Sequence, residues 1–157
     1  MALKNQSFII ATSWGDIVVR ACEGKVVDCS LPSVGDEQSV PFSITSSGGS
    51  RVEKFICNVF LGRQSTMPAI GELDGTPFQK KVWNELSRIP LGETRSYGQV
   101  AAAIGRPSAY RAVANACGRN PLPLFIPCHR VVGSDGELHG FSSGTAWKKM
   151  LLQVELN

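Results

Sequence analysis

The sequence predicts an α+β protein, in which a small antiparallel sheet with one helix precedes a mostly helical lobe. Three observations favour this fold class. Short β-branched or apolar runs lie near the start of the chain, and apolar residues recur at helical spacing after residue 51. The composition, 157 residues of which 43% are hydrophobic, is that of an ordinary globular protein. We therefore expect two lobes, over residues 1–70 and 71–157.

The first lobe is predicted to contain a three-stranded meander. The runs at residues 8–12, 17–21 and 26–31 are separated by Trp-Gly-Asp and Glu-Gly-Lys, which are typical of turns. Residues 33–50 are rich in Ser and Gly and predict a mobile connection. Apolar residues at i, i+3, i+4, i+7 and i+8 then predict a helix over residues 52–60.

Two helices are predicted at the start of the second lobe. Thr76 is a good N-cap, a proline follows it, and an apolar stripe runs from there to Ile89. The spacing of Ser96 and Gln99 is that of a capping box, which predicts a short helix over residues 97–104. We expect the first of these helices to serve as scaffold.

A helix-turn-helix is predicted next. Ser108 is placed to cap a helix over residues 109–117, and the few residues before it contain Gly, as this motif often does. This second helix is lined by small residues, and Arg111 is its one long cation. Such a helix could lie close against a nucleic-acid groove, or it could be buried against its neighbour with Arg111 at the surface. The pattern leaves both possibilities open.

The end of the chain predicts one more helix, after a Gly-rich turn at residues 133–136. The apolar face of this helix consists of Trp147, Met150, Leu151 and Val154. The same helix carries Glu155, which from the residues alone reads as a surface residue near a helix end.

The composition indicates the cellular compartment of the protein. No apolar run approaches 18 residues and no charged start leads into an apolar segment, so we expect no membrane span and no export signal. Five cysteines without paired spacing suit free thiols in a reducing compartment. We expect a cytoplasmic protein, or a nuclear one in a eukaryote. Cys22, Cys29 and Cys57 lack a nearby histidine or a CxxC step, so we expect no metal site.

Charge is spread unevenly along the chain. Residues 1–75 carry 6 basic and 8 acidic side chains, whereas residues 76–157 carry 10 basic and 5 acidic ones. A basic half suits a polyanionic partner such as nucleic acid. Charge alone is equally compatible with a solvated surface.

The strongest chemical signal is a cysteine beside a histidine, between apolar residues. A free thiol has a pKa of about 8.5, so its reactive thiolate is a minority at neutral pH unless a neighbour lowers that pKa. His129 and Arg130 are candidates for this neighbour of Cys128, and Pro127 predicts a defined turn at the start of an apolar strand. For the dipeptide alone, a buried cysteine beside a satisfied histidine is the more common arrangement.

Five blocks of sequence resemble the O6-alkylguanine-DNA alkyltransferase family. They lie at residues 75–79, 92–97, 111–113, 120–121 and 127–131, and the last block reads Pro-Cys-His-Arg-Val. Five spaced blocks in the right order are far more specific than any one of them. The resemblance covers the part of the chain from about residue 70 to residue 155, and the part before it matches only loosely.

The resemblance implies direct-reversal DNA repair. Members of this family flip O6-alkylguanine, such as O6-methylguanine, out of double-stranded DNA, with O4-methylthymine as a further candidate lesion. They transfer the alkyl group irreversibly to a cysteine in a single turnover, which is the activity of a methylated-DNA–protein-cysteine S-methyltransferase. The resemblance implies no cofactor, no metal, no membrane partner, and a monomer in the absence of DNA.

The resemblance also implies roles for individual residues. The catalytic set is Cys128 as nucleophile, His129 as its base through a water, Glu155 as the carboxylate that orients the histidine, Tyr97 as a donor to the purine ring, and Asn120 as a support of the site. The residues implied to contact DNA are Ser96, Tyr97, Ala109, Arg111, Ala112, Ala114 and Asn115. Of these, Arg111 would fill the space left by the flipped nucleotide. The substrate-pocket residues are Pro123, Phe141, Ser142 and Ser143.

Two positions depart from the family pattern. Phe141 stands where the family usually has a tyrosine, and Ser143 stands where a glycine is usual. The missing tyrosine hydroxyl affects a contact to the base, and the serine side chain affects the width of the pocket. Two other classes of function stay open: a cysteine hydrolase, which needs an oxyanion hole and turns over repeatedly, and a lesion-binding module of the alkyltransferase-like kind. The presence of Cys128 argues against the lesion-binding module.

Overall fold

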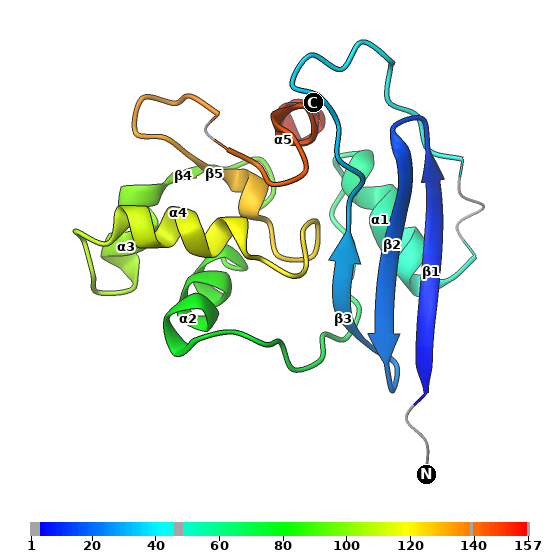
Figure 1. Cartoon of the computed structure of the whole chain (residues 1–157), viewed down its shortest axis with the longest axis horizontal. Helices are drawn as coiled ribbons and strands as arrows, with labels where there is room; N and C mark the ends of the chain where they lie inside the picture. Colours follow the sequence, from blue (N-terminus) through cyan, green and yellow to red (C-terminus); the bar gives the residue numbers. More distant parts are fainter. Residues whose placement is uncertain (1–3, 46–48, 139, 157) are drawn as a thin grey trace.

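The computed structural model describes residues 4–45, 49–138 and 140–156. Its first part is a three-stranded antiparallel sheet in the order β1-β2-β3. The strands are Asn5–Thr12, Gly15–Cys22 and Lys25–Ser30. Helix α1, Arg51–Phe60, lies beside the sheet (Figure 1), so the predicted meander and helix are confirmed. The predicted Ser- and Gly-rich connection includes residues 46–48, which lie outside the described residues.

The central strand shows why this sheet forms. In β2, Ile17 and Val19 are fully buried whereas Asp16 and Arg20 are exposed, and this alternation matches the two faces of a strand. The apolar face shares one core with the buried side of α1. That helix starts at Ser50, whose side chain accepts a hydrogen bond from a backbone N–H in the first turn.

The second part of the chain is mostly helical (Figure 1). Its elements are α2 (Pro77–Leu86), β4 (Arg95–Ser96), α3 (Tyr97–Ala103), α4 (Tyr110–Gly118), the 3₁₀ turn η1 (Cys128–Arg130), β5 (Val131–Val132) and α5 (Thr145–Leu156). Both predicted capping boxes form: Gln79 N donates to Thr76 Oγ1 at 3.1 Å, and Gln99 N donates to Ser96 Oγ at 3.0 Å. The predicted α+β fold class is confirmed.

Two local predictions are wrong. Helix α2 ends at Leu86 and does not continue through Ile89, because the chain tightens into i to i−3 hydrogen bonds that still leave Ile89 buried. Ser108 does not cap α4. The N-cap is Ala109, whose methyl group cannot accept a capping hydrogen bond. Ser108 lies one residue earlier, inside a tight turn in which Ala109 N donates to Arg106 O at 2.9 Å.

Helix α5 is fastened to the segment that follows β3. Trp147 is fully buried, and its Nε1 donates to Pro32 O at 2.9 Å. Val34 N donates to Ser143 O at 3.0 Å just before the helix, and the hydroxyl of Thr145 donates to Asp36 Oδ1 at 2.9 Å. One continuous hydrophobic core therefore runs from the sheet to α5. The predicted boundary at residue 70 stays a prediction.

Candidate active site

Cys128 sits on a tight turn. Pro127 has φ −79° and ψ 65°, and Cys128 N donates to Ile126 O at 2.8 Å, which is an inverse γ-turn. Arg130 N then donates to Pro127 O at 3.0 Å and closes η1. The predicted turn at Pro127 is therefore present, and it places Cys128 with 7% of its surface exposed.

Asn120 holds this turn from the start of the same loop. Its Nδ2 donates to Ile126 O at 2.9 Å, and its Oδ1 accepts from Leu122 N at 2.9 Å. Burial raises the pKa of Cys128, while a hydrogen bond with Asn120, the ammonium of Lys148 and two backbone N–H groups act in the opposite direction. Desolvation therefore disfavours the thiolate form of Cys128, whereas these hydrogen bonds and the charge of Lys148 favour it.

His129 forms a buried pair with Glu155. Nε2 of the histidine lies 2.7 Å from Oε1 of the glutamate, and the two side chains are only 1% and 2% exposed. Burial lowers the pKa of His129, although Glu155 acts to raise it. Because a carboxylate only accepts, Nε2 carries the proton of the neutral imidazole. Nδ1 is then the basic atom, and among the described residues it has no hydrogen-bond partner.

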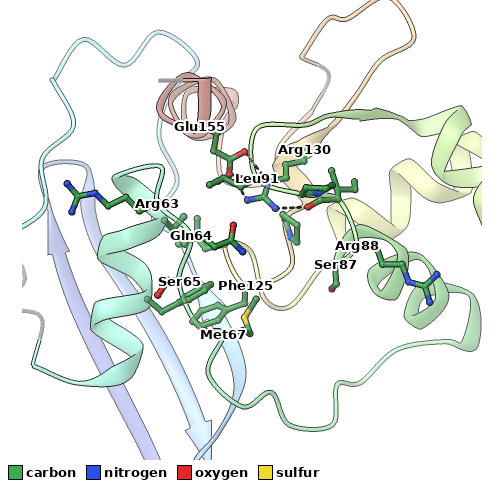
Figure 2. A pocket seen from close by; sticks show the side chains of 16 residues that line it. Arg63, Gln64, Ser65, Met67, Ser87, Arg88, Leu91, Phe125, Arg130 and Glu155 are labelled. Atoms are coloured by element: carbon green, nitrogen blue, oxygen red, sulfur yellow. Dashed lines mark hydrogen bonds and ion pairs between the residues drawn. The ribbon is translucent and has the colours of Figure 1, made fainter.

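Arg130 completes this cluster from the other side of the carboxylate. Its Nε donates to Glu155 Oε2 at 3.0 Å, its Nη2 donates to Oε1 at 2.9 Å, and its Nη1 donates to Ile89 O at 2.7 Å, as Figure 2 shows. Burial on its own would raise the pKa of Glu155, but hydrogen bonds and charge from His129 and Arg130 lower it to about 2. The reading of Glu155 as a surface residue is therefore wrong, because tertiary packing covers this helix end.

The Arg130–Glu155 pair also borders a cavity of about 330 Å³. Figure 2 shows its walls, which come from α1, the segment after it, the loop after α2, and the residues around Phe125. Cys128 is not part of its lining. Arg130 was a candidate for the cation beside the thiol, but its guanidinium is engaged with Glu155 and Ile89 instead.

A second cavity, of about 420 Å³, contains Cys128. Its lining includes Tyr97, Ala114, Cys117, Asn120, Pro123, Cys128, Phe141, Ser142 and Lys148. The structure thus brings together most of the residues expected in the catalytic and pocket sets. Ser143 is not in the lining, and its hydroxyl instead lies 3.5 Å from Leu31 O. Sequence reasoning missed Cys117 and Lys148; the signal for Lys148 was its position seven residues before Glu155 on one helix.

The expected DNA-contacting residues lie on and near α4. Arg111, Ala112 and Asn115 are exposed, whereas Ala109 and Ala114 are half-buried. The guanidinium of Arg111 lies 5.8 Å from the centre of the Tyr110 ring. The opposite side of α4 is buried through Val113 and Ala116, so α4 has one packed face and one open face. Ser96 is half-buried and uses its side chain to cap α3.

The described residues contain no group of three or more His, Cys, Asp or Glu side chains that could hold a metal ion. The five cysteines are all free thiols. Over residues 4–45, 49–138 and 140–156, no helix has both the length and the apolar character that crossing a bilayer requires.

Comparison with known proteins gives the family. Residues 77–157, more than half of the chain, match the family described as "6-O-methylguanine DNA methyltransferase, DNA binding domain". The chain belongs to this family. The expected family is thereby confirmed.

Named relatives agree with this assignment. The chain is 56% identical over 84 residues to a methylated-DNA–protein-cysteine methyltransferase of Methanosarcina barkeri, a match that covers 54% of this chain and 53% of that protein. It is 50% identical over 97 residues to the constitutive methyltransferase of the same name from Bacillus subtilis, covering 61% and 59%. In these matches the chain spans about half the length of its curated relatives.

Solved structures extend the similarity to the whole chain. The crystal structure of O6-methylguanine methyltransferase from Mycobacterium tuberculosis has a TM-score of 0.79 and 32% identity, covering 98% of this chain and 93% of that one. The structure of Mycobacterium tuberculosis OGT in complex with DNA gives the same TM-score and identity, covering 97% and 92%. The similarity therefore includes the sheet, which the sequence matched only loosely.

Proposed function

We propose that this protein repairs DNA by moving the alkyl group of O6-alkylguanine, O6-methylguanine above all, onto Cys128. One structural observation is the main support for this proposal. Cys128 faces a cavity of about 420 Å³ and is followed directly by His129, which is held by a buried carboxylate. The family to which residues 77–157 belong and the names of its relatives support the same chemistry.

The transfer would proceed in one displacement. The proton of the Cys128 thiol moves to Nδ1 of His129, through a water, because Nε2 is occupied by its bond to Glu155. The thiolate attacks the alkyl carbon, a carbon–sulfur bond forms, and the bond from that carbon to O6 breaks. The leaving guanine takes up a proton, for which the phenol of Tyr97, also in the cavity lining, is a candidate donor. The proton that His129 accepted from the thiol balances the one that Tyr97 gives up, so the phenol is restored when the site re-equilibrates.

The product explains why each molecule would act once. A thioether sulfur is a poor leaving group, and water cannot release it as it releases a thioester. The scheme needs no metal, nucleotide or reductant. A cysteine hydrolase would instead turn over repeatedly, and a lesion-binding module would bind DNA without transfer, so a measurement of transfer per molecule separates all three.

DNA would be bound through the open face of α4. The substrate atom lies inside the base stack, so the nucleotide has to be flipped, at a cost of a few kcal/mol. Arg111 and Ala112 are exposed on this face, and a small side chain beside one long cation suits the minor groove. Arg111 would occupy the space left by the base. The relative in complex with DNA supports a DNA partner.

We further propose that the protein is a monomer without DNA and acts in the cytoplasm, or in the nucleus of a eukaryote.

The decisive experiment is a mass measurement. Protein mixed with a duplex that contains O6-methylguanine should gain 14 mass units, about one methylene, on the peptide that contains Cys128, with a ceiling of one per molecule. Cys128→Ala should keep DNA binding and lose transfer. Methylation of Cys117 instead, or turnover beyond one equivalent, would refute the proposal. A duplex containing O4-methylthymine tests the further candidate lesion in the same way.

A second experiment tests base flipping. Arg111→Ala should slow the repair of duplex DNA more than the reaction with free O6-methylguanine base, because only the duplex requires a flipped nucleotide. Arg119→Ala is the matched control, since Arg119 is an exposed arginine just after α4. An equal loss on duplex and free base in the Arg111 variant would remove its flipping role.

A further inference from the structure

Tyr110 is a large aromatic residue whose position the packing of the protein does not explain. It is the first residue of α4, and 48% of its surface is exposed. In the described part of the chain it belongs neither to the hydrophobic core nor to the partly buried apolar residues that pack against that core. Single exposed apolar residues are common on protein surfaces, so the neighbours of Tyr110 have to decide whether it has a function.

Two residues of the alkyl-transfer cavity follow Tyr110 on the same side of α4. Ala114 and Cys117 lie four and seven residues after it, which is the spacing of residues on one helix face. Both line the cavity that contains Cys128. Arg111, on the open face of α4, is about 100° further round the helix. Tyr110 therefore lies at the start of the side that leads to the cavity, next to the face that carries Arg111.

The ring of Tyr110 also contacts the guanidinium of Arg111. Consecutive residues of a helix point in different directions and do not normally face each other. Here the central carbon of the guanidinium lies 5.8 Å from the centre of the Tyr110 ring, within the range of a cation–π attraction. The two side chains therefore turn toward each other. Because an exposed arginine has many rotamers, this contact reduces the orientations that Arg111 adopts before DNA binds.

We propose that Tyr110 positions Arg111 for base extrusion. The ring holds the guanidinium on the cavity side of α4, so the arginine enters the duplex as the nucleotide moves toward Cys128. Tyr110 is a positioning residue, because it acts through Arg111 and does not touch the reacting atoms. This role rests on the proposed function, in which Arg111 fills the space of the flipped nucleotide. A cation–π contact at an exposed site corresponds to about a two- to fivefold effect, and to more when water is excluded.

The first test compares two replacements of Tyr110. Tyr110→Phe keeps the aromatic face, whereas Tyr110→Leu keeps an apolar side chain and loses that face. In single-turnover transfer from a duplex with O6-methylguanine, the leucine variant should be about fivefold slower and the phenylalanine variant close to the natural chain. With free O6-methylguanine base, which needs no extrusion, both variants should stay within about twofold of the natural chain. Since Tyr110 is exposed, neither replacement should unfold the protein.

A double variant shows whether Tyr110 acts through Arg111. Adding Tyr110→Leu to Arg111→Ala should cost nothing further on duplex DNA, because no guanidinium is left for the ring to hold. Losses that multiply in the double variant would show that the ring acts on DNA by itself, and equal losses in the Phe and Leu variants would assign the effect to the hydroxyl. Either result overturns the inference.

A matched control tests for a general effect of removing an exposed apolar side chain. Ile9 is 66% exposed on β1, in the sheet and away from α4 (Figure 1), so Ile9→Ala should leave the transfer rates on both substrates unchanged. A loss on duplex DNA in Ile9→Ala as large as that in Tyr110→Leu would remove the specific role of Tyr110.

Base extrusion can also be measured without alkyl transfer. In the Cys128→Ala protein, a duplex with 2-aminopurine beside the lesion reports unstacking by a rise in fluorescence. At saturating protein, adding Tyr110→Leu should lower the ratio of extruded to stacked base about fivefold, and an unchanged ratio would overturn the inference. If extrusion depends on Tyr110 but the natural chain transfers nothing to Cys128, the proposed function fails and the role of Tyr110 in extrusion stands. If transfer occurs and does not depend on Tyr110, only the inference fails.

Discussion

Glu155→Gln is the sharpest test of the buried cluster behind Cys128. Glu155 accepts hydrogen bonds from His129 and Arg130, and its side chain is 2% exposed. A carboxyl group whose pKa falls from 4.5 to about 2 on folding contributes about 3 kcal/mol at neutral pH. Glutamine keeps an acceptor but removes the charge, so the variant should lose about 2–3 kcal/mol of unfolding free energy.

The stabilisation by Glu155 should also decrease as the pH falls. Because the pKa of Glu155 is lower in the folded state than in the unfolded state, its contribution is complete above about pH 5.5 and disappears as pH falls toward about 2. Urea denaturation should therefore show a gap between the natural chain and the variant that is large at pH 7 and narrows in acid. Glu93→Gln is the control, because Glu93 pairs with Arg95 at the surface at 3.7 Å and should cost less than about 0.5 kcal/mol. A loss below about 1 kcal/mol in Glu155→Gln, or a gap independent of pH, would refute the reasoning.

Three further substitutions test how the scaffold holds the site, each by denaturant unfolding. Thr76→Ala removes the capping box of α2 and should cost about 1 kcal/mol. Trp83→Phe removes the buried 2.8 Å hydrogen bond from Nε1 to Ala116 O and should cost about 1–3 kcal/mol; a neutral outcome would mean that the carbonyl finds another donor. Gly144→Ala combines a φ of 111° with a Cβ that meets the carbonyl of Val34, so a loss above about 2 kcal/mol is expected and a stabilised variant would contradict the geometry.

The parts of the fold that the sequence predicted well are those with local causes. Thr76 and Ser96 each cap a helix with a glutamine three residues later, and both pairs form as the spacing indicated. The start of α4 had no comparable signal. Ser108 is a suitable capping residue by type, but the tight turn through Arg106 places Ala109 at the N-cap. Residue type identifies candidate caps, and the backbone decides which of them can reach.

The candidate site was predictable where its residues are close in sequence and much less so where they are not. The turn at Pro127 follows from the stiffness of proline, so the presentation of Cys128 could be anticipated. The seven-residue spacing of Lys148 and Glu155 puts them on one face of α5, but it does not reveal whether that face is covered. Only the packing of α5 against η1 decides this, and that packing depends on contacts far along the chain.

Those distant contacts connect the segment after β3 to the candidate site. The segment after β3 holds the start of α5 through the bonds from Trp147 to Pro32 and from Thr145 to Asp36. Helix α5 in turn presents Lys148 to the cavity and Glu155 to His129. Because α5 is fixed at its start and carries both side chains on one face, a rotation or shift of α5 would move Lys148 out of the cavity lining and Glu155 away from His129. The segment after β3 therefore helps to position two charged side chains near Cys128, although neither Pro32 nor Asp36 lines the cavity that contains Cys128.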